Sequence, residues 1–451
     1  MAHVVTCFLR HAESVLLVRR ADDAPTYPGR WAGVSGYVEG DTDLTEPDAR
    51  REVDEETGLT DDDLRLVRAG DPLAVHDSAG GPDDWVVHPF LFEAATREVT
   101  TNDEVAECEW VQPTAILDRE TVPGLWDAYR RVGPTVADVA ADETHGSARL
   151  SVRALAVLRD TAGDAERVDD DWVHVAETAR ALRSSHPGMA PLRTRIDRVL
   201  AESDRTPAAV RRRAETAVSE ALSADDGAAA VAAERLAAVA SDAADAERPT
   251  VLTCSRSGTV AAALRRTDPR PDVVVAESRP GGEGVGVAES LAREPHEPET
   301  TVTLLPDSAV AQVLADPDAV DAPRVDAVLV GSDAVLPDGS VVNKVGTRGV
   351  ALAAAAAAVP VFVVTARDKI SGSEEFVPAA VEAGAVYDGD APLDVVAPLF
   401  DRTPADLVTA VLTEDGSLSP EAVRSVAADH AELTAWLAAV EGSPADDGEQ
   451  T

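Results

Sequence analysis

From residue 249 to about residue 364, short valine-rich runs alternate with stretches of helical spacing, and this alternation constrains the fold more than any other feature of the chain. The runs lie at residues 250–253, 273–276, 301–305, 327–330 and 359–364. Runs of four to six residues rich in β-branched side chains are typical of strands that are buried on both faces. The sequence therefore predicts a Rossmann-like α/β domain, with a parallel sheet and helices on both sides.

The rest of the 451-residue chain divides into parts with different patterns. Up to about residue 130, short apolar runs separated by Gly, Pro and Asp turns predict strands, with one strongly charged helix at residues 47–57. A segment rich in Ala, Arg, Leu and Glu follows, and its apolar residues recur at helical spacing. We expect an α/β multidomain protein with domains at 1–133, 145–247 (helical) and 248–420, and a C-terminal helix and unstructured tail in 421–451.

Acidic residues outnumber basic ones by 82 to 40, so the formal net charge is −42. Such a surface repels phosphate backbones and acidic membranes, and we expect no direct nucleic-acid binding and no membrane binding. Acid excess and cores of Ala and Val are typical of halophilic proteins that stay soluble in concentrated salt. The longest apolar run, residues 350–366, is interrupted by Pro360 and predicts a buried helix followed by a strand.

The three cysteines, Cys7, Cys108 and Cys254, are far apart in the sequence. This spacing supports neither a disulfide framework nor a zinc ribbon, and it fits a reducing compartment. The first twenty residues carry charges early and lack a long apolar core, so they do not look like a signal peptide. We expect a cytoplasmic protein.

A cluster of carboxylates lies in the charged helix. Glu52, Glu55 and Glu56 fall at positions i, i+3 and i+4, which share one helix face. Three like charges repel one another unless a divalent cation lies among them, and oxygen-only ligation suits Mg²⁺ or Mn²⁺. In so acidic a chain, three acids at this spacing arise by chance on the order of three times, so the triple alone also fits a solvated face.

The complete frame around the helix is rarer than the triple. It runs from Gly36-Tyr-Val-Glu39-Gly40 through Arg51-Glu52 to Gly58-Leu59 and resembles the Nudix box of Nudix pyrophosphohydrolases. Residues 15–20, 27–31 and 109–111 also resemble that family. The resemblance implies an α/β/α sandwich that hydrolyses a nucleoside diphosphate compound.

The same resemblance implies roles for four residues of the charged helix. Glu52, Glu55 and Glu56 would be catalytic metal ligands for Mg²⁺ or Mn²⁺. Arg51 would orient the helix by ion pairing and contact the substrate. The spacing from Gly36 to Arg51 is one residue longer than in the family, and only Asp41 and Asp43 lie near the position of the family's remaining glutamate.

A second group of polar residues lies in the Rossmann-like part. Asp333 follows a predicted strand, and Asn343-Lys344-Val-Gly346-Thr347 opens an Ala-rich helix. Amides at a helix N-terminus together with one lysine form a phosphate site. The chain has 38 arginines and only two lysines, and both Lys344 and Lys369 fall in this region. The wide guanidinium cannot replace a compact ammonium in a tight pocket, although two solvent-facing lysines remain the alternative.

Further motifs in the same order strengthen this assignment: residues 277–280, 307–309, 400–404 and 412–416. Together they resemble the family shared by the alpha, beta and delta subunits of eukaryotic translation initiation factor 2B, methylthioribose-1-phosphate isomerase and ribose-1,5-bisphosphate isomerase. The resemblance covers about residues 145–420. It implies binding of a phosphorylated sugar or nucleotide and self-association into a homo-oligomer through this domain.

For the isomerases the resemblance implies a catalytic Cys and Asp. Asp333 matches the Asp, but Cys254 stands one position before the Cys of the isomerases, and Ser255 occupies that place. At a strand end such an offset turns a side chain to the opposite face. Cys254 is alternatively a small buried thiol. The candidate substrate-binding residues are Gly146, Ser255, Arg256, Arg279, Asn343, Lys344, Gly346, Thr347 and Lys369.

Two classes of function remain open at this point. In the first, the N-terminal domain cleaves a nucleoside diphosphate compound and the second domain binds or isomerises a phosphorylated product. In the second, both domains sense nucleotides as a regulatory or translation-initiation-related binding protein. Ser255-Arg256-Ser257 is more similar to the initiation-factor subunits and favours binding over isomerisation.

Overall fold

A computed structural model describes residues 2–76, 84–242, 248–294 and 300–441. The tail predicted at 442–451 lies outside the described residues. Contacts divide the chain into a first unit of Met1–Val139, Ala156–Thr178 and Arg205–Glu215 and a second unit of Ala140–Leu155, Ala179–Asp204 and Thr216–Thr451. The domain boundaries given above stay a prediction.

The first unit is built around a mixed sheet in which β1 and β7 run parallel at the centre. The main strand order is β3-β2-β1-β7-β5, and β4, β6 and β8 pair with β1, β7 and β2. The strands are β1 (Ala2–His11), β2 (Ser14–Arg20), β3 (Trp31–Ala32), β4 (Val34–Tyr37), β5 (Leu64–Ala69), β6 (Leu73–His76), β7 (Asp84–Ala94) and β8 (Val105–Val111). The short apolar runs that predict strands, at residues 4–9, 15–18, 85–92 and 108–111, fall in β1, β2, β7 and β8.

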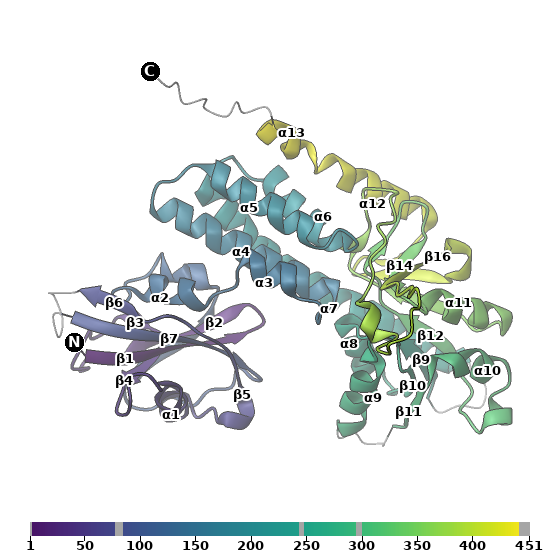
Figure 1. Cartoon of the computed structure of the whole chain (residues 1–451), viewed down its shortest axis with the longest axis horizontal. Helices are drawn as coiled ribbons and strands as arrows, with labels where there is room; N and C mark the ends of the chain where they lie inside the picture. The colour runs from purple at the N-terminus through teal and green to yellow at the C-terminus, as the bar shows by residue number, and fades with distance from the viewer. Residues whose placement is uncertain (1, 77–83, 243–247, 295–299, 442–451) are drawn as a thin grey trace. The chain divides into compact units, whose positions relative to one another are not determined.

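Helices cover both faces of this sheet, as Figure 1 shows for α1 (Glu46–Thr57) and α2 (Leu125–Val132). Alternation along β1 divides the core: Val5 and Cys7 pack with Val53 of α1, whereas Phe8 packs with Leu125 of α2. A short helix, α3 (Val136–Ala141), follows. The predicted α/β/α sandwich is confirmed.

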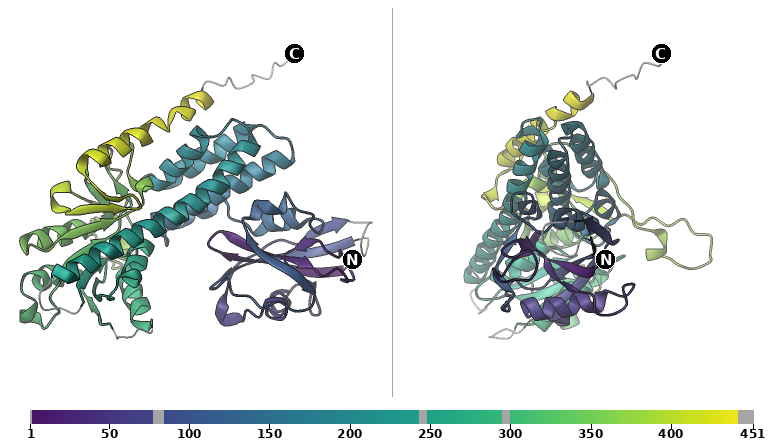
Figure 2. Two further views of the ribbon diagram at one scale, coloured as in Figure 1. Left: turned by 180° about the vertical axis from the view of Figure 1, so that it is seen from behind. Right: turned by 90° about the vertical axis from the view of Figure 1, so that its left-hand side faces the viewer.

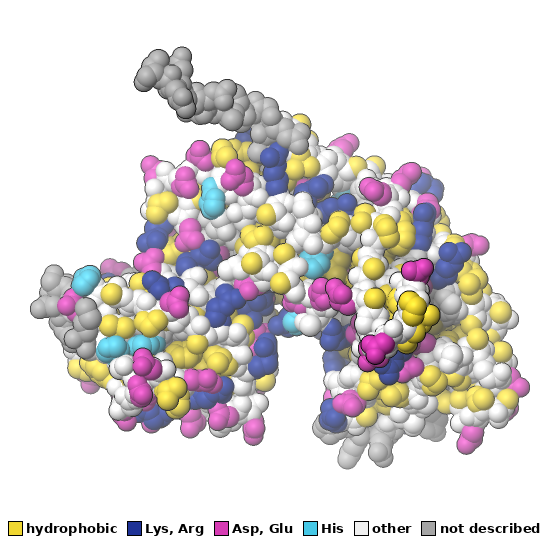
Figure 3. Space-filling view, in the orientation of Figure 1, with side chains coloured by type: hydrophobic (Ala, Val, Ile, Leu, Met, Phe, Trp, Pro, Cys, Tyr) yellow, Lys and Arg dark blue, Asp and Glu magenta, His cyan; other side chains and the backbone are white. Residues whose placement is uncertain are grey.

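Between residues 147 and 242 the described chain forms helices, as its periodicity predicts. They are α4 (Ser147–Arg167), α5 (Trp172–Ser185), α6 (Ala190–Ala201) and α7 (Pro207–Asp242). In the described ranges, no helix combines the length and apolar character that a membrane span requires. Figure 3 shows acidic and basic side chains interspersed over the visible face, so the net negative charge is not gathered in one patch there.

The second unit contains a seven-stranded sheet in the order β11-β10-β9-β12-β15-β17-β18, parallel except for the last pair. The strands are β9 (Thr250–Cys254), β10 (Asp272–Ala276), β11 (Val302–Leu305), β12 (Ala327–Val330), β15 (Val361–Val364), β17 (Ala410–Thr413) and β18 (Gly416–Leu418). The predicted Rossmann-like parallel sheet is confirmed. The strand order reverses between β9 and β12, where open α/β sheets bind their ligands.

Helices pack on both faces of this sheet. One apolar cluster joins α7 to α8 (Gly258–Arg266) and α9 (Glu283–Arg293), and the opposite cluster joins α10 (Val310–Ala315), α11 (Thr347–Ala356) and α12 (Pro420–Glu432). A final helix, α13 (Ala435–Glu441), follows α12. The run at residues 350–366 is therefore a helix followed by a strand, as predicted.

The sequence pattern did not predict a small antiparallel sheet of β13 (Ala334–Val335), β14 (Val341–Lys344) and β16 (Phe400–Thr403). Its strands have two to four residues, too few for a period to be recognised. Between β15 and β16, residues 374–398 are mostly exposed, and the right-hand view in Figure 2 shows this yellow-green segment standing away from the second unit. The small sheet places Asn343 and Lys344 beside the crevice at β12.

Candidate functional sites

Helix α1 holds its carboxylates in a fixed orientation. It begins with Glu46 and Asp48 in its first turn, where acidic side chains favour the helix dipole, and it ends at Gly58. Gly58 has φ +71° and donates its N–H to the Asp54 carbonyl, a left-handed cap that glycine adopts most easily. Ala49 and Val53 are buried against the sheet, so the positions between them present Glu52 to the neighbouring loop.

Gly36 makes room for the Glu52 carboxylate. A Cβ atom at position 36 would lie 1.9 Å from the carboxyl carbon of Glu52. Any residue other than glycine there would therefore force the Glu52 side chain to move. Arg51 lies beside them, with Nη1 3.0 Å from Glu39 Oε1 and Nη2 2.9 Å from Glu52 Oε1. The structure thus brings together the glycine, the arginine and two glutamates of the sequence motif.

The three candidate metal ligands differ in burial. Glu56 is 5% exposed, Glu52 is partly buried and Glu55 is exposed. Burial and, secondly, the Glu52 charge raise the pKa of Glu56 to about 8, although the Ser35 N–H and the Arg20 charge oppose that rise. Burial also raises the pKa of Glu52, an effect that Arg51 opposes and Glu55 reinforces. Arg51 and Arg20 thus offset only part of the cost of keeping these carboxylates ionised.

In the described part of the chain, no three His, Cys, Asp or Glu side chains are gathered closely enough to hold a metal ion. The donor chemistry nevertheless fits a hard divalent cation, because Glu52 and Glu56 offer only oxygen atoms and the Glu52 charge raises the pKa of Glu56 through repulsion. Positive charge between these two carboxylates would remove that repulsion. Glu52, Glu55 and Glu56 are thus the residues that would hold the ion.

A cavity of about 560 Å³ adjoins these carboxylates. Its polar lining includes Arg20, Arg51, Glu52, Glu55 and two acids that the sequence patterns did not single out, Asp103 and Glu104. Glu104 raises the pKa of both Glu52 and Glu56, although burial is the larger cause for each. Its place in a loop gave no periodic signal, and only the fold brings it to α1.

The same cavity has an aromatic wall. Tyr27, Tyr37 and Trp85 line it, and the Tyr37 and Trp85 ring centroids are 5.9 Å apart. The same lining therefore has an aromatic part as well as carboxylates. One cavity thus offers different surfaces to the two ends of a ligand.

The second candidate site lies where β9 and β12 end, at the reversal of strand order. A cavity of about 300 Å³ there is lined by seven of the predicted residues: Gly146, Ser255, Arg256, Asp333, Asn343, Lys344 and Lys369. Arg279, Gly346 and Thr347 do not line it. In this lining Cys254 ends β9, residues 255–258 follow it and residues 331–333 follow β12, as expected for parallel strands whose carboxyl ends meet at one edge.

Both lysines of the chain are buried in this lining. Lys344 is 5% exposed and Lys369 is 3% exposed, so the alternative of two solvent-facing lysines is wrong. Lys344 Nζ lies 2.5 Å from Glu283 Oε1, and Lys369 Nζ donates to the Ser332 carbonyl at 2.9 Å. Burial lowers the pKa of Lys369, with Asp225 and Asp333 opposing that effect.

The N-terminus of α11 is already capped. The Asp401 carboxylate accepts the N–H of Gly346 at 2.8 Å and that of Arg348 at 3.1 Å. Thr347 Oγ1 donates to the Lys344 carbonyl at 2.7 Å and accepts from Asn343 Nδ2 at 3.0 Å. Gly346 and Thr347 therefore organise the β14–α11 turn in this structure, and the cavity is lined by Asn343 and Lys344 instead.

Asp333 lies at the end of β12 beside the start of α4. It accepts hydrogen bonds from the Ser147 hydroxyl and backbone N–H. Burial raises the pKa of Asp333, while Lys369 and Ser147 oppose that effect. The sequence pattern identified Asp333 but not Ser147, although Ser147 adjoins the predicted Gly146 loop.

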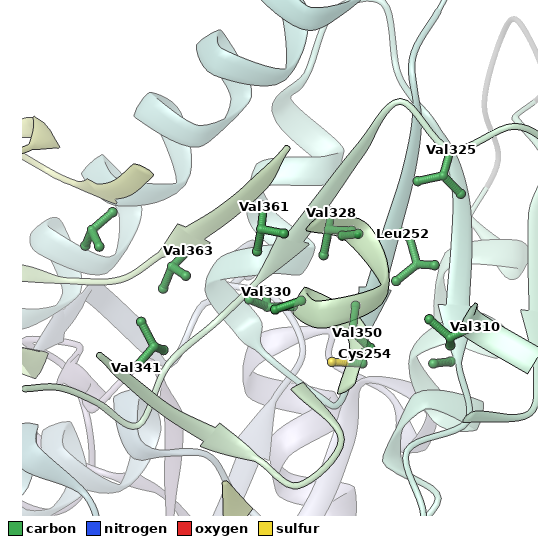
Figure 4. Packing of buried hydrophobic residues seen from close by; sticks show 14 of the residues in the cluster. Leu252, Cys254, Val310, Val325, Val328, Val330, Val341, Val350, Val361 and Val363 are labelled. Carbon is green, nitrogen blue, oxygen red and sulfur yellow. The ribbon is translucent and has the colours of Figure 1, made fainter. Parts of the chain in front are cut away.

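Cys254 ends β9 and adjoins the cavity, but its side chain belongs to an apolar cluster. Figure 4 shows Cys254 beside Val350, among the valines of the sheet. Its sulfur lies 3.8 Å from Thr347 Oγ1, and burial raises the pKa of the thiol to about 12. Ser255 follows with φ +64°, outside strand geometry, and its N–H donates to Ser278 Oγ at 2.6 Å.

A buried network of charges adjoins Lys369, which lines this cavity. Arg195 is 2% exposed; its Nε donates to Asp368 Oδ2 at 3.1 Å and its Nη1 to Ser151 Oγ at 2.8 Å. Arg198 Nη1 donates to the other Asp368 oxygen at 2.5 Å. Burial would raise the pKa of Asp368, but Arg195 and Arg198 lower it overall. Asp368 directly precedes Lys369, so this pairing fixes the backbone that carries the lysine.

Comparisons with known proteins agree with this two-part organisation. A model of the Initiation factor 2 subunit family matches residues 143–420, and a NUDIX domain model matches residues 2–132. Methylthioribose-1-phosphate isomerase from Gemmatimonas aurantiaca is 30% identical over 331 residues, which cover 68% of this chain and 90% of that enzyme.

A second relative is ribose 1,5-bisphosphate isomerase from Haloferax volcanii, 37% identical over 161 residues; the match covers 34% of this chain but only 46% of that enzyme. The crystal structure of translation initiation factor eIF-2B from Pyrococcus horikoshii OT3 matches with a TM-score of 0.50 at 20% identity, over 63% of this chain and 94% of that one. At that identity the structural match shows the fold alone.

Proposed function

Because the chain belongs to the Initiation factor 2 subunit family and carries a NUDIX domain at residues 2–132, we propose that it combines two phosphate chemistries. The first unit hydrolyses a nucleoside diphosphate compound with the help of Mg²⁺ or Mn²⁺. The second unit binds a phosphorylated sugar or nucleotide. The observation that carries the proposal is the pair of cavities, one lined by the Glu52 and Glu55 carboxylates and the other by Lys344 and Lys369.

In the first cavity, Glu52, Glu55 and Glu56 would hold the divalent cation. Bound there, the ion would neutralise a diphosphate and help to ionise an attacking water. Arg51 holds Glu39 and Glu52 in place through its two ion pairs. Among the charged residues of the lining, six acids outnumber two arginines, so the cavity repels a diphosphate that arrives without cations, and this supports a metal-dependent reaction.

In the second cavity, buried ammonium groups supply the positive charge. Lys344 and Lys369 are pre-placed by Glu283 and by the Ser332 carbonyl, and Arg256 adds a third cation to the lining. Fixed, desolvated cations bind a phosphate without reorganising. This arrangement supports binding of a phosphorylated small molecule in the absence of metal.

Sugar-phosphate isomerisation is the second candidate for this cavity. The named relatives are isomerases, and Asp333 is partly buried in the lining. Proton transfer between two carbons needs an acid and a base on either side of the sugar. Cys254 is buried in the apolar cluster and its thiol has a pKa of about 12, which favours binding without turnover.

Self-association and a cytoplasmic setting are also part of the proposal. The segment between β15 and β16 exposes Val386, Leu393 and Val396, with 86% of Val396 accessible. Apolar side chains grouped on one projecting segment support contact with a second copy of the chain. The same segment offers no support for a nucleic-acid or membrane partner.

One screen tests the main proposal. The full chain is incubated with nucleoside diphosphate sugars and, separately, with ribose 1,5-bisphosphate, each in Mg²⁺, Mn²⁺ or a chelator, and both phosphate products and isomerised sugar are measured. We expect hydrolysis with either ion and none with the chelator. Hydrolysis that persists with the chelator, or release of isomerised sugar from a ribose bisphosphate, would overturn the corresponding half of the proposal.

A further inference from the structure

His430 on α12 is a buried histidine with a partner at each ring nitrogen. It is 5% exposed; its Nδ1 lies 2.7 Å from the Ile370 carbonyl oxygen, and its Nε2 lies 3.0 Å from Arg198 Nη2. A carbonyl oxygen only accepts and a guanidinium only donates, so Nδ1 carries the proton and Nε2 accepts. The surroundings of the ring are therefore complementary to the neutral form of His430.

These two contacts reach both chain neighbours of Lys369. Ile370 directly follows the lysine and receives the Nδ1 proton. Arg198 donates from Nη1 to Asp368 Oδ1 at 2.5 Å, and Asp368 directly precedes the lysine. Lys369 lines the second cavity, whereas His430 does not. His430 thus holds the backbone on either side of a lysine of that site and acts there only through other residues.

The chain that follows Lys369 is packed tightly against α12. A Cβ atom at Gly372 would lie 2.6 Å from the backbone nitrogen of Ala431, so glycine permits this close approach. The N–H of Ser371 donates to the Val335 carbonyl at 2.7 Å, which fixes the same segment to β13. A change in the contacts of His430 is therefore passed to a packed segment rather than absorbed by a loose loop.

His430 also adjoins solvent, because it lines a hollow of about 610 Å³ together with Arg198 and Asp368. Charged side chains from the surrounding elements line the same hollow: Glu202, Glu220, Arg367, Glu414, Asp415 and Asp429. Arg367 pairs with Asp429 at 3.3 Å, and Arg198 pairs with Glu202 at 3.9 Å. The two arginines thus share the hollow with the acids, and a proton can reach the ring through it.

A proton on Nε2 would disrupt the contact with Arg198. It would remove the acceptor of the Arg198 N–H and place a second positive charge 3.0 Å from the guanidinium nitrogen. Burial is the largest cause that lowers the pKa of His430. The Ile370 carbonyl and Asp368 oppose that effect, whereas Arg198 and Arg367 reinforce it. The electrostatics therefore agree with the geometry in favouring the neutral ring.

We propose that neutral His430 is a positioning residue for Lys369, and that its protonation in mild acid weakens ligand binding in the second cavity. This inference rests on the proposed binding of a phosphorylated ligand there. Protonation releases Arg198 from the ring, and because Arg198 also holds Asp368, Lys369 is then less firmly placed. The pKa is lowered in the folded state, so the contribution of His430 is complete above the unfolded pKa of about 6.5 and is lost as the pH falls through the folded pKa.

The first test compares how ligand affinity depends on pH. The full chain is titrated calorimetrically with ribose 5-phosphate at about pH 7.5 and about pH 5, with a chelator present so that the first unit takes up no ligand through a metal. Wild type is compared with His430→Gln, which keeps an acceptor for Arg198 and does not titrate. The ligand phosphate gains a proton near pH 6, and Asp333 also titrates, but both do so in every protein compared. His174→Gln, at an exposed histidine of α5, is the matched control.

We expect the two profiles to diverge in acid. At about pH 7.5 His430→Gln should bind up to about threefold more weakly than wild type, because the glutamine reproduces the Arg198 contact imperfectly. Between about pH 7.5 and about pH 5 wild type should lose roughly tenfold more affinity than His430→Gln, because only wild type loses that contact on protonation. His174→Gln should lose as much affinity as wild type. Parallel profiles for wild type and His430→Gln would overturn the proposal.

The second test observes the ring itself by NMR of the full chain with ¹⁵N-labelled histidine. The His430 resonances are those missing from His430→Gln. Coupling is reciprocal, so a tenfold loss of affinity on protonation requires that saturating ribose 5-phosphate lower the titration midpoint of His430 by about one pH unit. A histidine with a merely structural role would titrate at the same midpoint with and without the ligand.

The outcomes separate the inference from the function on which it rests. If wild type binds no ribose 5-phosphate at about pH 7.5, the proposed function and this inference both fail. If wild type binds it and the profiles are parallel or the midpoint does not move, only the inference fails. A thermal melt at each pH confirms folding. His430→Asn, which keeps a donor for the Ile370 carbonyl, is the second variant if His430→Gln does not fold.

Discussion

The two candidate sites distribute charge in opposite ways. In the first unit, burial and then repulsion from neighbouring carboxylates raise the pKa values of Glu56 and the partly buried Glu52. In the second unit the buried charges are paired, as in Lys344 with Glu283 and Asp368 with Arg195. An unbalanced carboxylate cluster depends on a diffusible cation for its function. A balanced set of buried charges is organised before the ligand arrives. The same acid-to-amide substitution should therefore have opposite effects on stability in the two units.

The largest effect is expected for Asp368→Asn. Removing this carboxylate leaves the buried Arg195 with only the more distant Asp225, and the partly exposed Arg198 with only Glu202, as counter-charges. Breaking a buried pair in this way lowers the free energy of unfolding by about 3 kcal/mol or more. Urea unfolding of the full chain measures the change, and Asp429→Asn, at an exposed ion pair with Arg367, is the control. A loss under about 1 kcal/mol would mean that the pair is not needed to organise the site.

The direction of the pKa shift of Asp368 determines how its contribution to stability depends on pH. The pKa of Asp368 is lowered in the folded state, so its contribution is complete above the unfolded pKa of about 4 and is lost as the pH falls through the folded pKa. Acid should therefore destabilise wild type more steeply than Asp368→Asn below about pH 4. Parallel stability curves for the two proteins over this range would contradict the assignment.

The next effect concerns activity in the first unit. Glu56→Gln should lower metal-dependent hydrolysis by at least about 100-fold, because losing even a partner of a metal ligand costs 10- to 100-fold. The free energy of unfolding without metal should stay the same or rise, because a repelled, buried carboxylate has been neutralised. Asp54→Asn, on the exposed side of the same helix, should change neither quantity. Loss of folding together with activity would make Glu56 a structural residue and remove the contrast between the units.

A smaller effect tests whether the second site needs an ammonium group. Lys344→Arg keeps the charge but places a wide guanidinium where Lys344 is 5% exposed and 2.5 Å from Glu283. Ribose 5-phosphate should bind about tenfold more weakly, close to 1.4 kcal/mol. Calorimetric titration measures the affinity, with the exposed Arg424→Lys on α12 as the control. Equal affinity for wild type and Lys344→Arg would show that only charge matters there.

The sequence was most informative where a residue type is rare or a frame is long. Two lysines among forty basic residues identified the second cavity, and the run from Gly36 to Leu59 identified α1. It could not identify Glu283, Glu104 or Asp401, since each is one acid among 82 and only the fold brings it to a site. The same limit explains why Gly346 and Thr347, which were predicted to bind substrate, do not line the cavity. An amide at a helix N-terminus can be satisfied by a distant carboxylate that local sequence does not reveal.

The smallest effect is expected for Cys254→Ser, which tests whether the second unit has a catalytic thiol. Burial raises the pKa of Cys254 to about 12, so near pH 8 about one thiol in 10⁴ is ionised and the group is a poor acid, base or nucleophile. Cys254→Ser should leave ribose 5-phosphate affinity within about twofold of wild type. Turnover of ribose 1,5-bisphosphate or methylthioribose 1-phosphate should be undetectable in both proteins. Iodoacetamide at pH 8, followed by mass spectrometry of the folded chain, should leave Cys254 unmodified. Turnover by wild type that stops in Cys254→Ser and in Asp333→Asn would instead establish an isomerase, with buried, balanced charges serving catalysis as well as binding.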